Sequence, residues 1–157
     1  MAYKHAKDLM IPLTGHISPD ETVSEASLKL RQTRRDEARV GVKGLPVIDS
    51  GGKLAGFLSM GDILKAVFPN YLSMDKNLGD FTWDGMLESF AHKAAEKKVS
   101  DIMTKKVVTV PSDAPLMECI EHMLNNNVKR LLVMDGTRVI GILYERDIFE
   151  TIADNLK

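Results

Sequence analysis

The stretch GFLSMGDI, residues 56–63, ends one apolar segment at Ser59 and begins another after Asp62. An apolar run that meets a hydroxyl residue, with an acid three positions later, is typical of a strand leading directly into a helix. The stretch has a counterpart in GILYERDI, residues 141–148, which shares its Gly, Leu, Asp and Ile. These two stretches indicate that the chain contains one structural unit twice.

Further matches in the same order support a tandem duplication. The segment 8–10 (DLM) corresponds to 101–103 (DIM), and 45–49 (LPVID) corresponds to 131–135 (LLVMD). The first copy is longer around 32–40 (QTRRDEARV). We therefore predict a first repeat over 1–68, a linker over 69–97 and a second repeat over 98–157.

Each repeat is predicted to run β-α-β-β-α, which gives a mixed α+β fold. In the second repeat the expected elements are a strand at 107–111, a helix within 112–127, strands at 130–135 and 138–143, and a helix from about 145. The first helix should be capped by Ser112 or Asp113, end in the Asn run, and bury Leu116, Ile120, Met123 and Leu124. The first repeat follows the same order, with strands near 16–18, at 45–49 and 54–58, and helices from about 20 and from 59.

The linker should contain an amphipathic helix over 84–97, with Trp83 at its start. Its apolar side is formed by Met86, Leu87, Phe90, Ala91 and Ala94. Such a stripe indicates packing on the core or on a dimer face rather than a ligand site.

Composition excludes several classes of function. The chain has 157 residues, of which 44% are apolar and 27% charged, and its net charge is −1. This balance disfavours a nucleic-acid or membrane partner, and the charged N-terminus does not resemble a signal peptide. A single cysteine, Cys119, cannot form an intramolecular disulfide, so a cytoplasmic location is expected.

Catalysis has little support in the sequence. The four histidines, at 5, 16, 92 and 122, lack metal-ligand spacing, and neither a Walker loop nor a nucleophile elbow is present. Cys119 lies near the apolar stripe of its helix, which favours a buried, inert thiol. We therefore expect neither enzyme activity, nor a bound metal, nor a required cofactor.

Ser59 and Asp62 have two interpretations. Ser-x-x-Asp at a helix start is a capping box, which needs no ligand. In the second repeat, however, Tyr144 replaces the serine while Asp147 remains. An acid at this turn could instead accept hydrogen bonds from the two hydroxyls of a ribose.

Basic residues precede the central strand of each repeat. They are Lys43 in the first repeat, and Lys129 and Arg130 in the second. Cations at the end of a strand can bind phosphate, with Arg doing so bidentately, although they can also be solvated.

The duplicated unit, with DLM or DIM before its first strand, LPVID in the middle and Gly-x-Leu-x-x-x-Asp-Ile at its end, resembles a tandem pair of cystathionine-β-synthase (CBS) domains, the Bateman module. The resemblance covers about 7–68 and 98–154 and suggests a stand-alone CBS-pair protein. It implies two repeats related by a pseudo-twofold axis, with clefts between them that bind AMP, ADP, ATP or S-adenosylmethionine. It also implies a homodimer.

The same resemblance assigns roles to residues. Asp62 and Asp147 would bind ribose hydroxyls, and Ser59 would support ribose or phosphate. Adenine would meet the backbone of the first strand of a repeat, and the basic residues would reach the phosphates. The implied contacts are Val107, Val108 and Thr109 in the second repeat, about 15–17 (including His16 and Ile17) in the first, and Lys43, Lys129 and Arg130.

The sequence departs from the family pattern at three places. Tyr144 replaces the usual Ser or Thr, and Gly44 stands where a basic residue is common. The extra residues around 34–39 could supply phosphate ligands or only lengthen a helix. One well-formed site is therefore expected rather than two equivalent ones.

The predicted function is a non-catalytic, dimeric sensor of an adenine nucleotide or adenosyl compound, in energy sensing or a related pathway. Ligand binding would change how the repeats or protomers are apposed and so signal to an unidentified downstream protein. The alternative is a ligand-free dimerisation or interaction scaffold, in which Asp62 and Asp147 serve only the helix starts.

Overall fold

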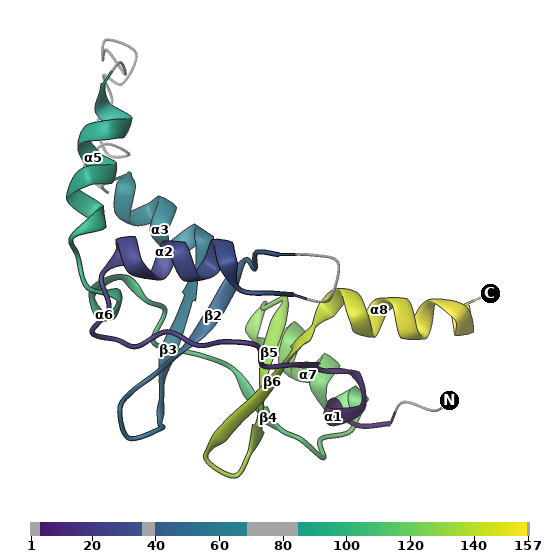
Figure 1. Cartoon of the computed structure of the whole chain (residues 1–157). Helices are drawn as coiled ribbons and strands as arrows, with labels where there is room; N and C mark the ends of the chain where they lie inside the picture. The colour runs from purple at the N-terminus through teal and green to yellow at the C-terminus, as the bar shows by residue number, and fades with distance from the viewer. Residues whose placement is uncertain (1–3, 36–39, 69–84, 157) are drawn as a thin grey trace. The chain divides into compact units, whose positions relative to one another are not determined.

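The computed structural model describes residues 4–35, 40–68 and 85–156. It divides into two compact units, each with its own β-structure and helices, as Figure 1 shows. Unit 1 contains Met1–Thr14, Gly52–Leu54 and Lys106–Lys157, and unit 2 contains Gly15–Gly51 and Ala55–Lys105. The predicted mixed α+β fold is confirmed.

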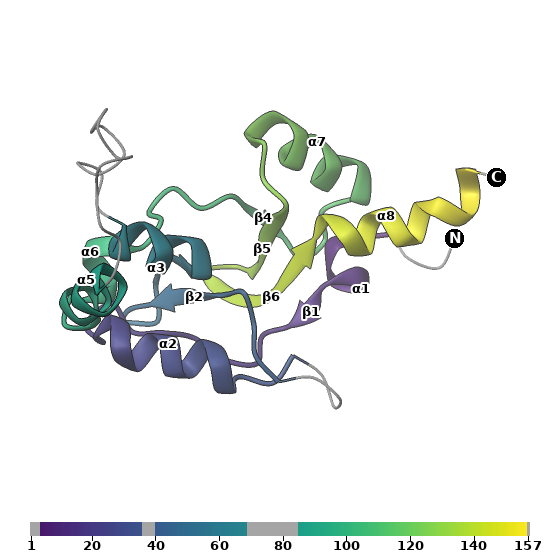
Figure 2. The ribbon, with the colours of Figure 1, turned by 90° about the horizontal axis from the view of Figure 1, so that it is seen from above.

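Unit 2 holds the central elements of the first repeat. Strands β2 (Gly44–Ile48) and β3 (Leu54–Ser59) are hydrogen-bonded neighbours, and the turn between them includes Gly52 at φ +82°. Ile17 forms a parallel bridge with Val47 of β2. Helices α2 (Val23–Gln32) and α3 (Met60–Val67) lie side by side over this hairpin, with β2 seen between them in Figure 2.

The core of unit 2 forms where α2 and α3 cover the hairpin. Fully buried Ile17, Val47 and Leu58 pack against Ala26 and Leu30 of α2. The linker helix α5 (Met86–Ala95) contacts α2 and α3, as its apolar stripe predicts, and buries Ala94. Leu87 of that stripe is 69% exposed, however, and the prediction for Trp83 lies outside the described residues.

Unit 1 contains a four-stranded sheet with strand order β1-β6-β5-β4. Strands β5 (Arg130–Asp135) and β6 (Arg138–Tyr144) pair antiparallel, β4 (Thr109–Pro111) pairs parallel with β5, and β1 (Ile11–Pro12) pairs antiparallel with β6. The helices are α1 (Ala6–Leu9), α7 (Leu116–Asn126) and α8 (Glu145–Ala153), followed by the 3₁₀ turn η2 (Asp154–Leu156). Cys119, Met123, Leu131 and Ile148 are among its buried core residues.

The start of α7 corrects one prediction. Its N-cap is Pro115 rather than Ser112 or Asp113, and the amide of Leu116 donates to the carbonyl of Lys4 at 3.2 Å. The chain's own N-terminal segment thus supplies the acceptor that a side-chain cap would have provided. The predicted end in the Asn run is confirmed, with Asn127 at φ 51°. Leu124, predicted to be buried, is 74% exposed.

The segment that precedes each repeat in the sequence packs in the unit formed mainly by the other repeat. We call these two segments, 1–14 and 98–105, the exchanged segments. Helix α6 (Val99–Ile102), which leads into the second repeat, lies in unit 2, and Thr104 bridges Phe57 of β3. Helix α1 and strand β1, which lead into the first repeat, lie in unit 1 against β6. The compact units therefore differ from the predicted sequence repeats at 1–14, 52–54 and 98–105.

Candidate functional site

The start of α3 is a capping box. The amide of Asp62 donates to Oγ of Ser59 at 3.1 Å, and the amide of Ser59 donates to Oδ2 of Asp62 at 3.0 Å. Both side chains thereby satisfy amides that a helix start leaves without intrahelical partners. The predicted capping box of Ser59 and Asp62 is confirmed.

Asp62 has a further partner that the sequence did not reveal. The hydroxyl of Thr104, 42 residues away in sequence, lies 3.1 Å from Oδ1 and 3.3 Å from Oδ2. The Asp62 side chain is only 9% exposed. Both of its carboxylate oxygens are thus engaged inside unit 2.

The corresponding junction in unit 1 is built differently. Tyr144 is the N-cap of α8, and its side chain caps no amide in the described part of the chain. Asp147 lies in the first turn of α8 and is half-buried. Within residues 4–35, 40–68 and 85–156 we find no donor to its carboxylate, although its backbone carbonyl accepts from Thr151 Oγ1 at 2.9 Å.

Basic residues lie beside both junctions. The amide of Met60 donates to the carbonyl of Lys43 at 2.8 Å, and the amide of Glu145 donates to the carbonyl of Lys129 at 2.9 Å. Arg130 pairs directly with Tyr144 across β5 and β6. The structure thus brings each predicted cation next to the predicted acid-bearing turn of its own repeat.

The start of β4 lies at the same end of the unit 1 sheet. Thr109 pairs with Leu132, and the amide of Leu132 donates to the carbonyl of Val108 at 3.1 Å. Because β4 and β5 are parallel, the residues before β4 lie beside the start of β5. We call this group the unit 1 edge. It comprises Val107, Val108, Lys129, Arg130, Tyr144 and Asp147.

The bridges also correct the alignment of the first strands. Val110 pairs with Val133, and Ile17 pairs with Val47, the residue that corresponds to Val133. Ile17 therefore corresponds to Val110, one residue beyond the contact range 107–109 predicted for the second repeat. Its side chain is fully buried, its amide donates to Pro46 O at 3.0 Å, and its carbonyl accepts from Ile48 at 2.8 Å. His16 is exposed and corresponds to Thr109.

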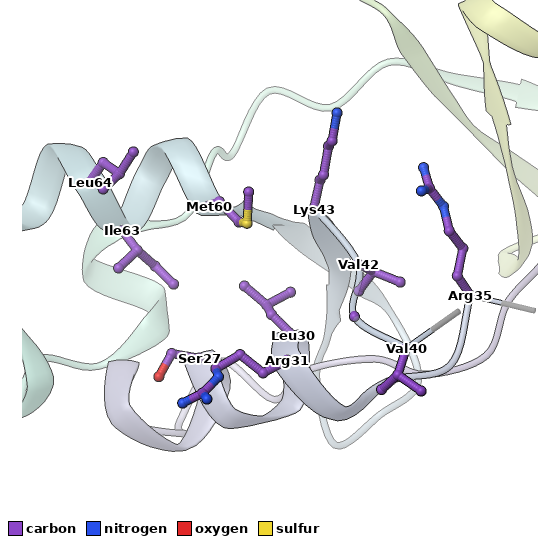
Figure 3. Close-up of a pocket in the computed structure, with 11 residues that line it drawn as sticks. Ser27, Leu30, Arg31, Arg35, Val40, Val42, Lys43, Met60, Ile63 and Leu64 are labelled. Atoms are coloured by element: carbon purple, nitrogen blue, oxygen red, sulfur yellow. The ribbon is translucent and has the colours of Figure 1, made fainter. Parts of the chain in front are cut away.

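Unit 2 has a surface pocket of about 640 Å³ between α2 and α3, shown in Figure 3. Its apolar lining includes Leu30, Val42, Met60, Ile63 and Leu64, and its cations are Arg31, Arg35 and Lys43. In Figure 3 the side chains of Lys43 and Arg35 extend toward the same side, whereas Arg31 points elsewhere. Arg35 comes from the extra segment of the first repeat, so this segment brings a cation near Lys43. Arg31 was not among the predicted residues, because α2 offered no motif that marks it.

Two other features bear on function. Burial raises the pKa of the Cys119 thiol to about 11, with the nearby Glu118 carboxylate adding to the effect.

No group of three potential metal ligands occurs among the described residues. In the same residues, every helix is too short or too polar to cross a membrane.

Comparison with known proteins identifies the repeated unit. The family model for the CBS domain matches residues 6–69 and 99–154. Inosine-5'-monophosphate dehydrogenase of Methanocaldococcus jannaschii is 33% identical over 150 residues, which cover 95% of this chain but only 24% of that enzyme. An uncharacterized protein of the same organism is 31% identical over 123 residues, covering 71% of this chain and 73% of the relative.

Solved structures show the same fold. A CBS domain-containing protein of unknown function from Kribbella flavida has a TM-score of 0.73 and 18% identity, covering 96% of this chain and 99% of that one. The cytosolic domain of the Mg²⁺ channel MgtE has a TM-score of 0.65 and 23% identity, covering 94% of this chain and 48% of that one.

Proposed function

Because the chain belongs to the CBS-domain family and carries two copies of the domain, we propose that it is a regulatory module that binds an adenine nucleotide or adenosyl compound. The structurally similar MgtE domain was solved in complex with ATP, which supports this ligand class. A ligand signals by favouring the conformation to which it binds more tightly. A downstream protein would read that conformation.

The proposal rests on the residues of the unit 1 edge. A ribose diol presents two donors, and the Asp147 carboxylate can accept both because no described residue donates to it. Lys129 and Arg130, beside the same turn, supply positive charge for phosphates. Val107 and Val108 lie at the same edge and are the backbone positions that would meet the adenine. The edge thus has suitable partners for each part of an adenine nucleotide.

The proposed function is binding without turnover. The one cysteine is buried, and its raised pKa keeps it a neutral thiol at physiological pH. The remaining groups at the unit 1 edge are an acid, two cations and a phenol. They suit recognition of a charged ligand and require no metal.

We further propose that the protein is a homodimer through the outer face of α2 and α3. Leu28 of α2 is 50% exposed, and Met60 and Leu64 of α3 are 50% and 68% exposed. Met60 and Leu64 lie together in the lining of the surface pocket, and neighbouring exposed apolar side chains of this kind mark association surfaces. Light scattering should give a dimer mass, and Leu64→Lys should give a monomer.

The ligand-free scaffold remains the second candidate, because the Asp62 capping box performs a structural role without any ligand. A thermal-shift panel of AMP, ADP, ATP, S-adenosylmethionine and GMP separates the two. A ligand at about 100 times its Kd stabilises by roughly 2.7 kcal/mol, or several degrees for a chain of this size.

Asp147→Asn should remove the shift, while Asp113→Asn, at an exposed acid of the same unit, should keep it. A shift with GMP alone, or with none of the five compounds, would contradict the proposal. In the latter case the scaffold candidate would be favoured.

A further inference from the structure

We propose that the surface pocket of unit 2 binds an amphiphilic anion, an aliphatic chain that ends in a carboxylate or a phosphate. The pocket lies between α2 and α3, and every residue that lines it belongs to unit 2. This site is separate from the unit 1 edge and does not depend on nucleotide binding there.

The pocket has the size and the surface of a small-molecule site. Its volume of about 640 Å³ lies within the range of ligand pockets, and its lining is mainly apolar. Leu30 in this lining is 4% exposed, whereas Met60 and Leu64 of α3 are 50% and 68% exposed. An aliphatic chain in the pocket would therefore cover apolar side chains that water now contacts, which favours binding.

The charged side chains of the pocket all have the same sign. Arg35 and Lys43 extend toward the same side in Figure 3, and in the described part of the chain neither has an ion-pair partner. None of the described residues that line the pocket is acidic. An anionic head group would pair with these two cations, and Arg can bind a carboxylate or a phosphate bidentately.

The same lining disfavours a nucleotide. Its described residues offer neither a carboxylate for a ribose diol nor an aromatic ring for a base. The hydroxyl of Ser27 already donates to the carbonyl of Ser24 at 2.9 Å. An aliphatic chain suits this lining better, because it needs no hydrogen-bond partner along its length.

The pocket overlaps the proposed dimer face, since Met60 and Leu64 belong to both. A bound chain and a second protomer would therefore compete for these two side chains. The ligand would favour the monomer, because it binds the form in which the pocket is open. This competition rests on the proposed dimer, whereas the pocket assignment does not.

Isothermal titration of the full chain with octanoate, decanoate and dodecanoate, below their micelle concentrations, tests the pocket. One equivalent should bind per chain, and each added methylene should tighten binding about fourfold until the pocket is filled. Decyl phosphate, measured beside decanoate, shows which head group the two cations prefer. Decyltrimethylammonium has the same chain with a cationic head and should not bind.

Arg35→Gln should weaken decanoate binding about tenfold, because it removes a charge-assisted hydrogen bond to the head group. Lys65→Gln is the matched control. Lys65 is an exposed cation of α3 outside the pocket lining, so this variant loses the same charge and should keep the wild-type Kd. Asp147→Asn should also bind decanoate normally, which separates this site from the proposed nucleotide site.

An affinity that changes neither with chain length nor with Arg35→Gln would overturn the pocket assignment, and so would equal binding of decyltrimethylammonium. Light scattering at saturating decanoate tests the competition, and the dimer mass should fall to that of a monomer. A dimer that persists with decanoate bound would overturn the competition. A wild-type chain that is monomeric without ligand would overturn the proposed dimer and, with it, the competition.

Discussion

Gly141 of β6 lies against Met10 so closely that a Cβ atom at position 141 would be 2.5 Å from the Met10 sulfur. The same atom would be 2.8 Å from the carbonyl oxygen of Ile11, which is backbone and cannot move aside freely. Gly56 has the equivalent relationship in unit 2, with Thr104 O at 2.6 Å. The glycine in each repeated stretch therefore accommodates the exchanged segment.

Gly141→Ala should consequently destabilise the protein by about 1–3 kcal/mol, the range for overpacking a close contact. Gly61→Ala is the matched control, because its Cβ would lie 3.5 Å from Ser59 Oγ in a helical segment. That variant should be neutral, or more stable by up to about 1 kcal/mol. Urea unfolding of the two variants measures the difference, and equal midpoints would show that the segment does not pack on β6 as described.

Thr104→Val should lower stability by about 1–2 kcal/mol, because it removes a hydrogen bond to a nearly buried carboxylate. Thr104→Ser should lose less, since the hydroxyl remains. The free energy of unfolding from urea titration distinguishes them. A valine variant as stable as the serine variant would mean that the Thr104 hydroxyl does not stabilise Asp62.

Cys119 should be inert toward thiol reagents in the folded protein. It is fully buried, and its pKa is raised to about 11, so almost no thiolate is present at pH 8. Reaction with a disulfide reagent should be slow in buffer and immediate in urea.

The same pKa predicts a loss of stability in base. The unfolded thiol ionises near pH 8.5, so the unfolded state binds fewer protons than the folded state above that pH. Stability should therefore fall between about pH 9 and 11, and Cys119→Ala should reduce this fall. Equal pH dependence in the two proteins would contradict the raised pKa.

Acid should weaken two helix starts. The backbone amide of Thr22 lowers the pKa of Glu25, and the amides of Lys4 and His5 lower that of Asp8. A lowered folded pKa gives stability that is present above the unfolded pKa, near 4, and is lost as the pH falls through the folded value. The double variant Asp8→Asn/Glu25→Gln should thus lose less stability between pH 5 and pH 2 than wild type. A urea midpoint measured across that range checks this, and parallel curves would contradict it.

The order of the longer elements was predictable because each carries a local signal, whereas the short α1, β1 and α6 were not predicted, and the strand expected near 16–18 is a single bridge at Ile17. The apolar runs at β2, β5 and β6, the glycine turns and the Ser59 cap all act within a few residues. The pairing of Lys43 with the start of α3, and of Lys129 with the start of α8, follows once each repeat folds on itself.

The partner of Asp62 was not predictable in this way. Thr104 precedes the second repeat in sequence, yet it packs on the last strand of the first, because the lead-in segments are exchanged. Backbone hydrogen bonds to β3 and β6, rather than a side-chain pattern, hold these lead-in segments in place. For the same reason Lys4, and not Ser112 or Asp113, satisfies the start of α7.

The most direct test of the account is a calorimetric titration of ATP into Asp147→Asn and Asp62→Asn, side by side with wild type. We predict that Asp147→Asn abolishes binding. Asp62→Asn should lower the melting temperature yet bind ATP with the wild-type Kd. Loss of binding in Asp62→Asn together with unchanged binding in Asp147→Asn would contradict the assignment of the ribose to the unit 1 edge.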